Sequence, residues 1–127
     1  MKFLAALALA LPLSSFAANY AACDLYAFTY SSSDWRNYTL VKSERLSNKW
    51  EKLANSDVVL NDSVYPVSYS VKFSLDGSIS GSLDLKIDQP GPSVQGSATI
   101  FDYLNLELED LYNGGKTVYK LECGLDS

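Results

Sequence analysis

Apolar and polar residues alternate on both sides of an Asp-Gly pair near the middle of the chain. Odd positions from 65 to 75 are all apolar, and after Asp76-Gly77-Ser78 the odd positions from 79 to 87 are again mostly apolar. A period of two is typical of a half-buried β-strand, and Asp-Gly between two such runs is a strong hairpin signal. We therefore predict a β-hairpin over residues 65–87, at the centre of the fold.

The register of this hairpin follows from keeping one of its faces apolar. A one-residue slip moves every side chain of a strand to the opposite face, so a two-residue loop would set apolar residues against polar ones. A loop with an odd number of residues avoids this mismatch, and the simplest such loop has three residues and a bulge. It predicts the following pairs: Leu75 with Ile79, Phe73 with Gly81, Val71 with Leu83, Tyr69 with Leu85 and Val67 with Ile87. The odd side chains of 65–75 should then be buried, with Gly81 leaving room for the ring of Phe73.

Further strands are predicted before and after this hairpin. Residues 23–30 are apolar on both faces, which is typical of a central strand covered on both sides. Shorter strands are predicted at 37–43 and 57–64. From 94 to 108 the apolar residues fall on even positions, which predicts two strands or one long strand bent at Asp102.

A second tight hairpin is predicted at Asn113-Gly114. Here a two-residue loop keeps the apolar residues on one face. The predicted pairs are Leu108 with Tyr119, Leu106 with Leu121 and Leu104 with Cys123.

Residues 44–54 interrupt the β pattern. Leu46, Trp50 and Leu53 recur at helical spacing with charged residues between them, which predicts one short amphipathic helix docked through Trp50. With about seven to eight strands joined mostly by short turns, the expected fold is mainly β, either a single antiparallel β-sandwich or a small β-barrel.

The first residues have the pattern of a secretory signal peptide. An apolar run follows a short charged start and ends at the small-x-small site Ser15-Phe16-Ala17. We therefore expect a signal peptide at 1–17 and a single antiparallel β domain at 18–127, exported to the periplasm or the extracellular space. The run is too short for a transmembrane helix, so we expect no membrane insertion. A lipoprotein acylated at Cys23 is a less favoured alternative, because Tyr20 stands where a small or aliphatic residue is needed.

The chain contains two cysteines, Cys23 and Cys123, near the two ends of the expected mature protein. An even number of cysteines in an exported chain predicts a disulfide, with Cα atoms about 4.4 to 6.8 Å apart. Two free buried thiols are the alternative. Two thiols without any histidine are a poor metal site, so we expect no metal and no cofactor.

The formal net charge is −5, and loss of Lys2 with the signal peptide would make it about −6. This balance argues against nucleic acid and anionic membrane surfaces as partners, because both need clustered Lys and Arg. A charged partner would more readily be basic.

Few residue types suited to catalysis are present. The chain contains no histidine, and a disulfide would remove both thiols, which excludes the usual triads and imidazole bases. Glu107 and Glu109 lie about 7 Å apart on one strand face, a separation that could serve glycoside hydrolysis. A charged strand end that discourages edge pairing is the favoured interpretation. Asn37 and Asn61 head glycosylation sequons.

Aromatic residues are the remaining candidates for function, because Tyr and Trp are common contact residues at interfaces. Those expected to bind lie in the turn after the first strand and beside the Asp102 bend: Trp35, Tyr38, Phe101 and Tyr103. The leading hypothesis is a small exported non-catalytic module that binds a protein or small ligand, including an enzyme inhibitor with acidic loops. The alternative is a carboxylate-based glycan hydrolase. Glu107 and Glu109 in a shared concave pocket would favour the enzyme, and an open face would favour the module.

Overall fold

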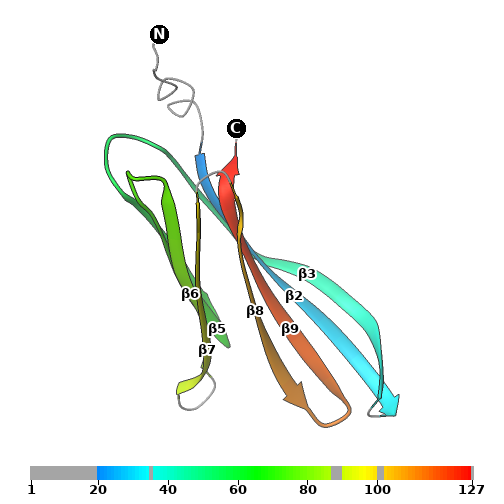
Figure 1. The fold of residues 1–127 in the computed structure, drawn as a ribbon. Coiled ribbons are helices and arrows are strands. Elements are labelled where there is room, and N and C mark those ends of the chain that lie inside the picture. The colour runs from blue at the N-terminus through cyan, green and yellow to red at the C-terminus, as the bar shows by residue number, and fades with distance from the viewer. Residues whose placement is uncertain (1–19, 35, 87–89, 100–101, 127) are drawn as a thin grey trace.

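The computed structural model describes residues 20–34, 36–86, 90–99 and 102–126. These residues form eight strands in two four-stranded antiparallel sheets (Figure 1). Across the first sheet the strands are β3 (Asn37–Lys52), β2 (Tyr20–Asp34), β9 (Gly115–Asp126) and β8 (Leu104–Tyr112). Across the second they are β4 (Val58–Val64), β5 (Val67–Phe73), β6 (Ser78–Lys86) and β7 (Pro90–Thr99). The predicted mainly β, antiparallel fold is confirmed, and it takes the form of a sandwich.

The core lies between the two sheets and is built by strict alternation. On β2 the odd residues from Ala21 to Ala27 are buried, and on β8 the even residues from Leu104 to Leu108. Gly81 lies where the sheets approach closely: a Cβ atom there would lie 2.7 Å from Val71 Cγ2 and 3.2 Å from Leu104 Cδ2. A larger residue at this position would push the two sheets apart.

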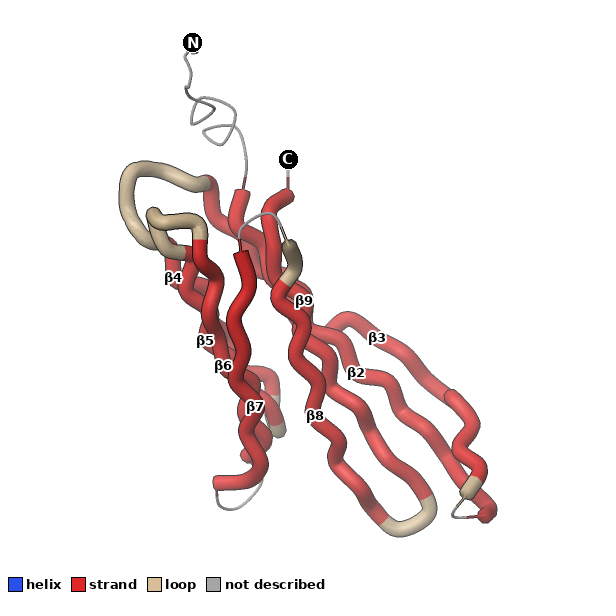
Figure 2. Tube along the Cα trace, in the orientation of Figure 1, coloured by secondary structure: helices blue, strands red, loops and turns tan. Residues whose placement is uncertain are grey.

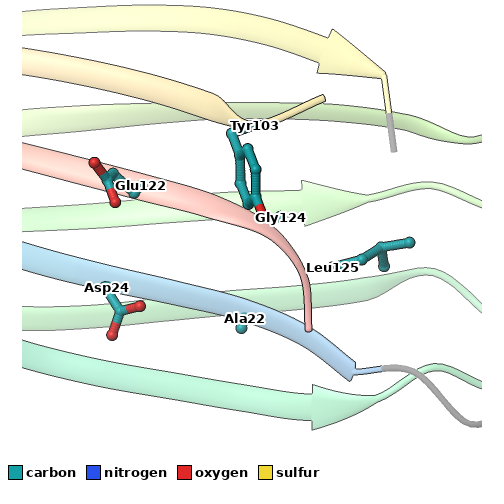
Figure 3. Close-up of a pocket in the computed structure, with 6 residues that line it drawn as sticks. All are labelled: Ala22, Asp24, Tyr103, Glu122, Gly124 and Leu125. Carbon is teal, nitrogen blue, oxygen red and sulfur yellow. The ribbon is translucent and has the colours of Figure 1, made fainter. Parts of the chain in front are cut away.

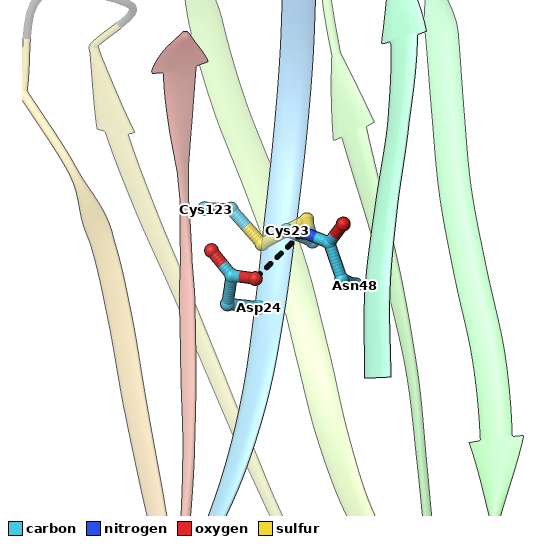
Figure 4. The surroundings of a disulfide bond; sticks show 4 residues. All are labelled: Cys23, Asp24, Asn48 and Cys123. Carbon is cyan, nitrogen blue, oxygen red and sulfur yellow. Dashed lines mark hydrogen bonds between the residues drawn. A yellow bond between two sulfur atoms is a disulfide. The ribbon is translucent and has the colours of Figure 1, made fainter. Parts of the chain in front are cut away.

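The first and last described strands lie side by side at the middle of the first sheet. β2 pairs with β9 along its length, and Cys23 stands directly opposite Cys123. The two form the predicted disulfide (Figure 4). Their Cα atoms are 4.1 Å apart, slightly closer than the expected range, because directly opposed residues of an antiparallel pair can approach this closely.

The second hairpin is confirmed in full. β8 and β9 are joined through Asn113-Gly114, and Gly114 has a positive φ of 82°. Leu108 pairs with Tyr119, and the other two pairs are as predicted.

The central hairpin has the predicted odd loop in a different register. Residues 75–77 form the loop, because the Ser74 N–H donates to the Ser78 carbonyl and Gly77 has a positive φ of 89°. Phe73 therefore pairs with Ile79, and the later pairs are shifted likewise: Val71 with Gly81, Tyr69 with Leu83 and Val67 with Leu85. A three-residue loop needs its left-handed residue in the third place, so the position of Gly77 sets the register.

Two ends of the predicted apolar run consequently lie outside the core. Leu75 is in the loop and 67% exposed, and Tyr65, just before β5, is 74% exposed. The prediction that every odd side chain of 65–75 is buried is correct from Val67 to Phe73 and wrong at both ends.

The helix predicted over 44–54 is wrong, since residues 44–52 belong to the long strand β3 and the last two residues of the stretch are neither helix nor strand. Leu46 and Trp50 are four residues apart, a spacing that fits a period of two as well as a helical turn. Pairing with β2 supplies the backbone hydrogen bonds, and register shifts beside Tyr26 and Tyr30 adapt the two strands to each other. Trp50 is not a docking anchor: it is exposed on the outer face, edge-on to the Tyr20 ring.

The remaining predicted strands are present. The stretch at 57–64 corresponds to β4, and the alternation from 94 to 108 resolves into the two strands β7 and β8. Asp102 lies between them, where its carboxylate accepts a hydrogen bond of 3.1 Å from the Thr99 hydroxyl.

A polar contact joins the two sheets where β3 and β4 pass each other. The buried Ser47 hydroxyl on β3 donates to the Asp62 carboxylate on β4 at 2.5 Å. This hydrogen bond lowers the pKa of Asp62 below its ordinary value of 3.8.

We expect Asp62→Asn to lower stability at neutral pH by about 1 kcal/mol, because the amide oxygen of Asn can still accept from Ser47 but the negative charge that strengthens this hydrogen bond is lost. A carboxyl whose pKa is lower in the folded state stabilises the fold above its unfolded pKa, and this contribution disappears as the pH falls through the folded value. The difference between wild type and variant should therefore shrink from about pH 5 downward. Urea unfolding at pH 6 and pH 3 checks this, and equal differences at both pH values would contradict it.

Candidate binding surface

The first sheet is longer than the second and extends past it. Figures 1 and 2 show the strands β2, β3, β8 and β9 diverging from the second sheet as they run towards the turn between β8 and β9, which contains Asn113-Gly114. We call this part the far half of the sheet. Its beginning is visible on β2, where the inner side chains are buried as far as Ala27, whereas Thr29 and Ser31 are not.

In the far half the inner face is polar and the outer face is largely apolar, which reverses the arrangement in the rest of the sheet. The inner row at Thr29 is polar and consists of Lys42, Thr29, Thr117 and Asp110. One step along, the outer row at Tyr30 carries Leu40, Tyr30, Lys116 and Leu111. Apolar residues thus point away from the side on which the second sheet lies.

The outer side of the far half gathers aromatic rings from two neighbouring strands. We call this side, together with the adjoining Tyr26, the aromatic face, and its apolar members are Tyr26, Phe28, Tyr30, Tyr38, Leu40, Leu111 and Val118. The rings of Tyr26 and Phe28 lie 6.2 Å apart at an interplanar angle of 29°. The three aromatic residues on β2 are half-buried and Tyr38 is exposed, so each of the four keeps part of its surface open to solvent.

The prediction that residues 23–30 are covered on both sides is therefore wrong for the outer side. The second sheet covers the inner side of β2 up to Ala27, and among the described residues no strand packs over the outer rings.

Two lysines of β9 lie across these rings. The Lys116 ammonium is 4.7 Å from the ring centre of Tyr38 and 5.5 Å from that of Tyr30. The Lys120 ammonium is 5.9 Å from the ring centre of Phe28. All three distances suit cation–π contacts, and the alkyl stems of such lysines cover apolar surface.

Each of these cations is also paired with a carboxylate. Lys116 lies 3.6 Å from Glu109, and Lys120 lies 3.5 Å from Glu107. On the β3 side, Arg45 lies 3.3 Å from Asp24. The aromatic face is thus close to neutral, although the whole chain carries a net charge of −5.

Glu107 and Glu109 do not form an enclosed acid–base pair. Their side chains are 57% and 55% exposed, and each is bound to a different lysine on an open sheet face. A general acid in glycoside hydrolysis needs a raised pKa, which burial away from cations would supply. By the criterion set out above, this arrangement favours the binding module.

Two shallow pockets lie near opposite ends of the sheet. The pocket at the end away from the turn has a volume of about 230 Å³ and is lined by Ala22, Asp24, Tyr103, Glu122, Gly124 and Leu125 (Figure 3). Asp24 and Glu122 are opposed on neighbouring strands, and Asp24 already accepts from Asn48 at 2.7 Å. A volume below about 300 Å³ is small for a drug-sized ligand.

The other pocket lies at the tip of the far half. It is lined by Ser32, Ser33, Tyr38, Tyr112, Asn113, Gly114 and Gly115. The Tyr112 hydroxyl donates to the Tyr30 carbonyl at 3.3 Å, so its ring lies across Gly115 towards β2. This pocket adjoins the aromatic face through Tyr38.

The two predicted binding residues that the structure describes, Tyr38 and Tyr103, are not brought together. Tyr38, 38% exposed, belongs to the aromatic face, whereas Tyr103, 66% exposed, lies against Gly124 at the other end of the sheet. The two ends of the sheet at which Tyr38 and Tyr103 lie are about 26 Å apart, taking the usual rise per residue along a strand. Trp35 and Phe101 lie outside the described residues.

Sequence reasoning did not select Tyr26, Phe28 and Tyr30 as candidate binding residues. A signal was available: after Ala27 the odd positions turn polar, at Thr29 and the serines beyond it, while the even positions stay aromatic. Such a change indicates that the apolar side of the strand switches from the core to the outside.

Within the described ranges, no three His, Cys, Asp or Glu side chains gather closely enough to hold a metal ion. The same ranges include no helix with the length and apolar character needed to cross a membrane. Comparison with known protein families, curated proteins and solved structures finds no match to this chain.

Proposed function

We propose that this protein is a small exported, non-catalytic binding module and that the aromatic face is its contact surface. The observation that carries the proposal is the exchange of polarity in the far half of the first sheet. A strand that only had to close the core would keep polar residues outside. Here partly exposed rings line the outside of two strands, and large exposed apolar patches on soluble proteins mark interaction sites.

The chemistry of the chain supports binding rather than catalysis. The sequence contains no histidine, and both cysteines are joined in a disulfide. The carboxylates on the aromatic face are held by lysines and arginine in the ion pairs described above. An inhibitor that inserts acidic loops into a basic active site would present unpaired carboxylates, so this version of the module is less favoured.

The test replaces two rings at the centre of the face. We expect Phe28→Ser/Tyr30→Ser to weaken binding to the natural partner at least tenfold, since aromatic residues at interfaces contribute about 2 kcal/mol or more each. The measurement is retention of partner material from the secreted fraction of the source organism on immobilised wild type and variant.

The matched control is Tyr65→Ser/Leu75→Ser, which removes two exposed apolar side chains next to the ends of β5 in the other sheet. It should retain the partner as wild type does. Equal retention by the face variant and the control would refute the aromatic face as the contact surface.

A further inference from the structure

We infer that the aromatic face binds an extended neutral polysaccharide; this inference rests on the proposed function. Three features of the face support it: the kind of apolar side chain, the pairing of its charges and its open shape.

The apolar residues that β2 contributes to the aromatic face are rings rather than aliphatic chains. Tyr26, Phe28 and Tyr30 follow one another at every second residue of the strand, and Tyr38 lies beside them, in contact with the same lysine as Tyr30. The face of an aromatic ring is electron-rich, so it attracts the weakly positive C–H groups on the flat side of a sugar ring. Lys116 and Lys120 lie over the rings of Tyr30 and Phe28, so a sugar would stack on the parts of the row that these two side chains leave open.

The charged groups between the rings suit hydroxyl groups better than an ionic ligand. Lys116, Lys120 and Arg45 are each neutralised by a carboxylate, so a strongly charged ligand gains little net attraction. Each cation nevertheless keeps donors, and each carboxylate keeps lone pairs, that its partner does not use. These spare positions can donate to and accept from sugar hydroxyls along the chain.

The same lysines weigh against a protein partner. Lysine and glutamate are depleted in the centres of protein–protein interfaces. Here Lys116 and Lys120 lie directly over the rings at the middle of the face. A protein covering the face would have to bury both ion pairs, whereas a sugar chain could leave them partly hydrated.

The shape of the face suits a polymer rather than a small molecule. The rings lie on the open side of a sheet, and of the residues that define the face only Tyr38 lines one of the two pockets described. A flat row without walls cannot surround a small ligand, but a chain lying along β2 contacts several rings at once, and these weak contacts add together.

The experiment is co-sedimentation of the purified protein with insoluble cellulose, chitin, xylan, mannan and β-1,3-glucan, compared with anionic polygalacturonate. We expect wild type to bind at least one neutral polymer, with binding that persists in 1 M NaCl because it does not depend on net charge. Phe28→Ser/Tyr30→Ser should lower the affinity at least tenfold and Tyr65→Ser/Leu75→Ser should not. Tyr38→Ala, which removes an exposed ring, should lower it severalfold even if the double variant folds poorly.

Other outcomes overturn the inference and separate it from the proposed function. Binding only to the anionic polymer, or binding abolished by salt, refutes a neutral ligand. No sedimentation with any polymer, together with face-dependent capture of a protein or face-dependent dimerisation in light scattering, refutes the polysaccharide while the contact surface stands. Polysaccharide binding that is equal in all variants refutes both.

Discussion

Replacing both cysteines is expected to lower the free energy of unfolding by about 2–5 kcal/mol. The disulfide joins residues 100 positions apart, so it restricts almost the whole described chain in the unfolded state. It also connects β2 with β9 at the centre of the first sheet, and both cysteines are fully buried there. The Cys23→Ala/Cys123→Ala variant tests this by urea unfolding followed by circular dichroism.

The control for the disulfide is wild type unfolded in the presence of a reductant. Reduced wild type and the double alanine variant should unfold at similar urea concentrations, because both lack the same cross-link. If the free energy of unfolding of the variant fell by less than about 1 kcal/mol, β2 and β9 would be shown to stay associated in the unfolded ensemble without the disulfide.

Phe73→Ala is expected to cost about 3–5 kcal/mol, because it removes a large ring from a closely packed core. Phe73 is only 2% exposed and pairs with Ile79 across the central hairpin. Leu75→Ala is the matched control two residues further along the chain, and it should change stability by no more than about 0.5 kcal/mol. Thermal unfolding of both variants by calorimetry gives the comparison.

This pair of variants also tests the hairpin register. If Leu75 were paired with Ile79, both side chains would be buried and both variants would be costly. A large loss for Leu75→Ala would therefore contradict the loop at residues 75–77.

The two halves of β2 have different roles in the molecule. Its first half supplies Cys23 and Leu25 to the core, and its second half presents Phe28 and Tyr30 to the outside. Substitutions in the first half should chiefly affect stability and those in the second half chiefly affect binding. The disulfide lies in the first half and holds the strand that carries the rings.

Several features of the molecule were determined by the sequence itself. The period of two identified most strands, the even number of cysteines in an exported chain predicted the disulfide, and Asn113-Gly114 with its flanking residues predicted the second hairpin pair by pair. These features depend on neighbouring residues or on a single cross-link. A two-residue turn leaves only one register that keeps the apolar side chains together.

Other features were decided only by the tertiary structure. Residues 44–54 have a spacing compatible with a helix and a strand, and pairing with β2 selected the strand. In the central hairpin, three-residue loops at 75–77 and at 76–78 both keep the apolar side chains on one face. The loop at 75–77 is the one formed, because its third residue must have a positive φ and Gly77 supplies it. Both choices depend on the full set of backbone pairings, which no single segment contains.

The aromatic face depended on which side of β2 the second sheet covers. The sequence of residues 23–30 shows apolar side chains on both sides of a strand, and this is compatible with two covering layers. Among the described residues a second layer covers only the inner side of β2, so the rings of Tyr26, Phe28 and Tyr30 remain on the outside. Which side of a strand is covered by another layer is a property of the assembled strands, and for this reason the principal candidate site became visible only in the folded molecule.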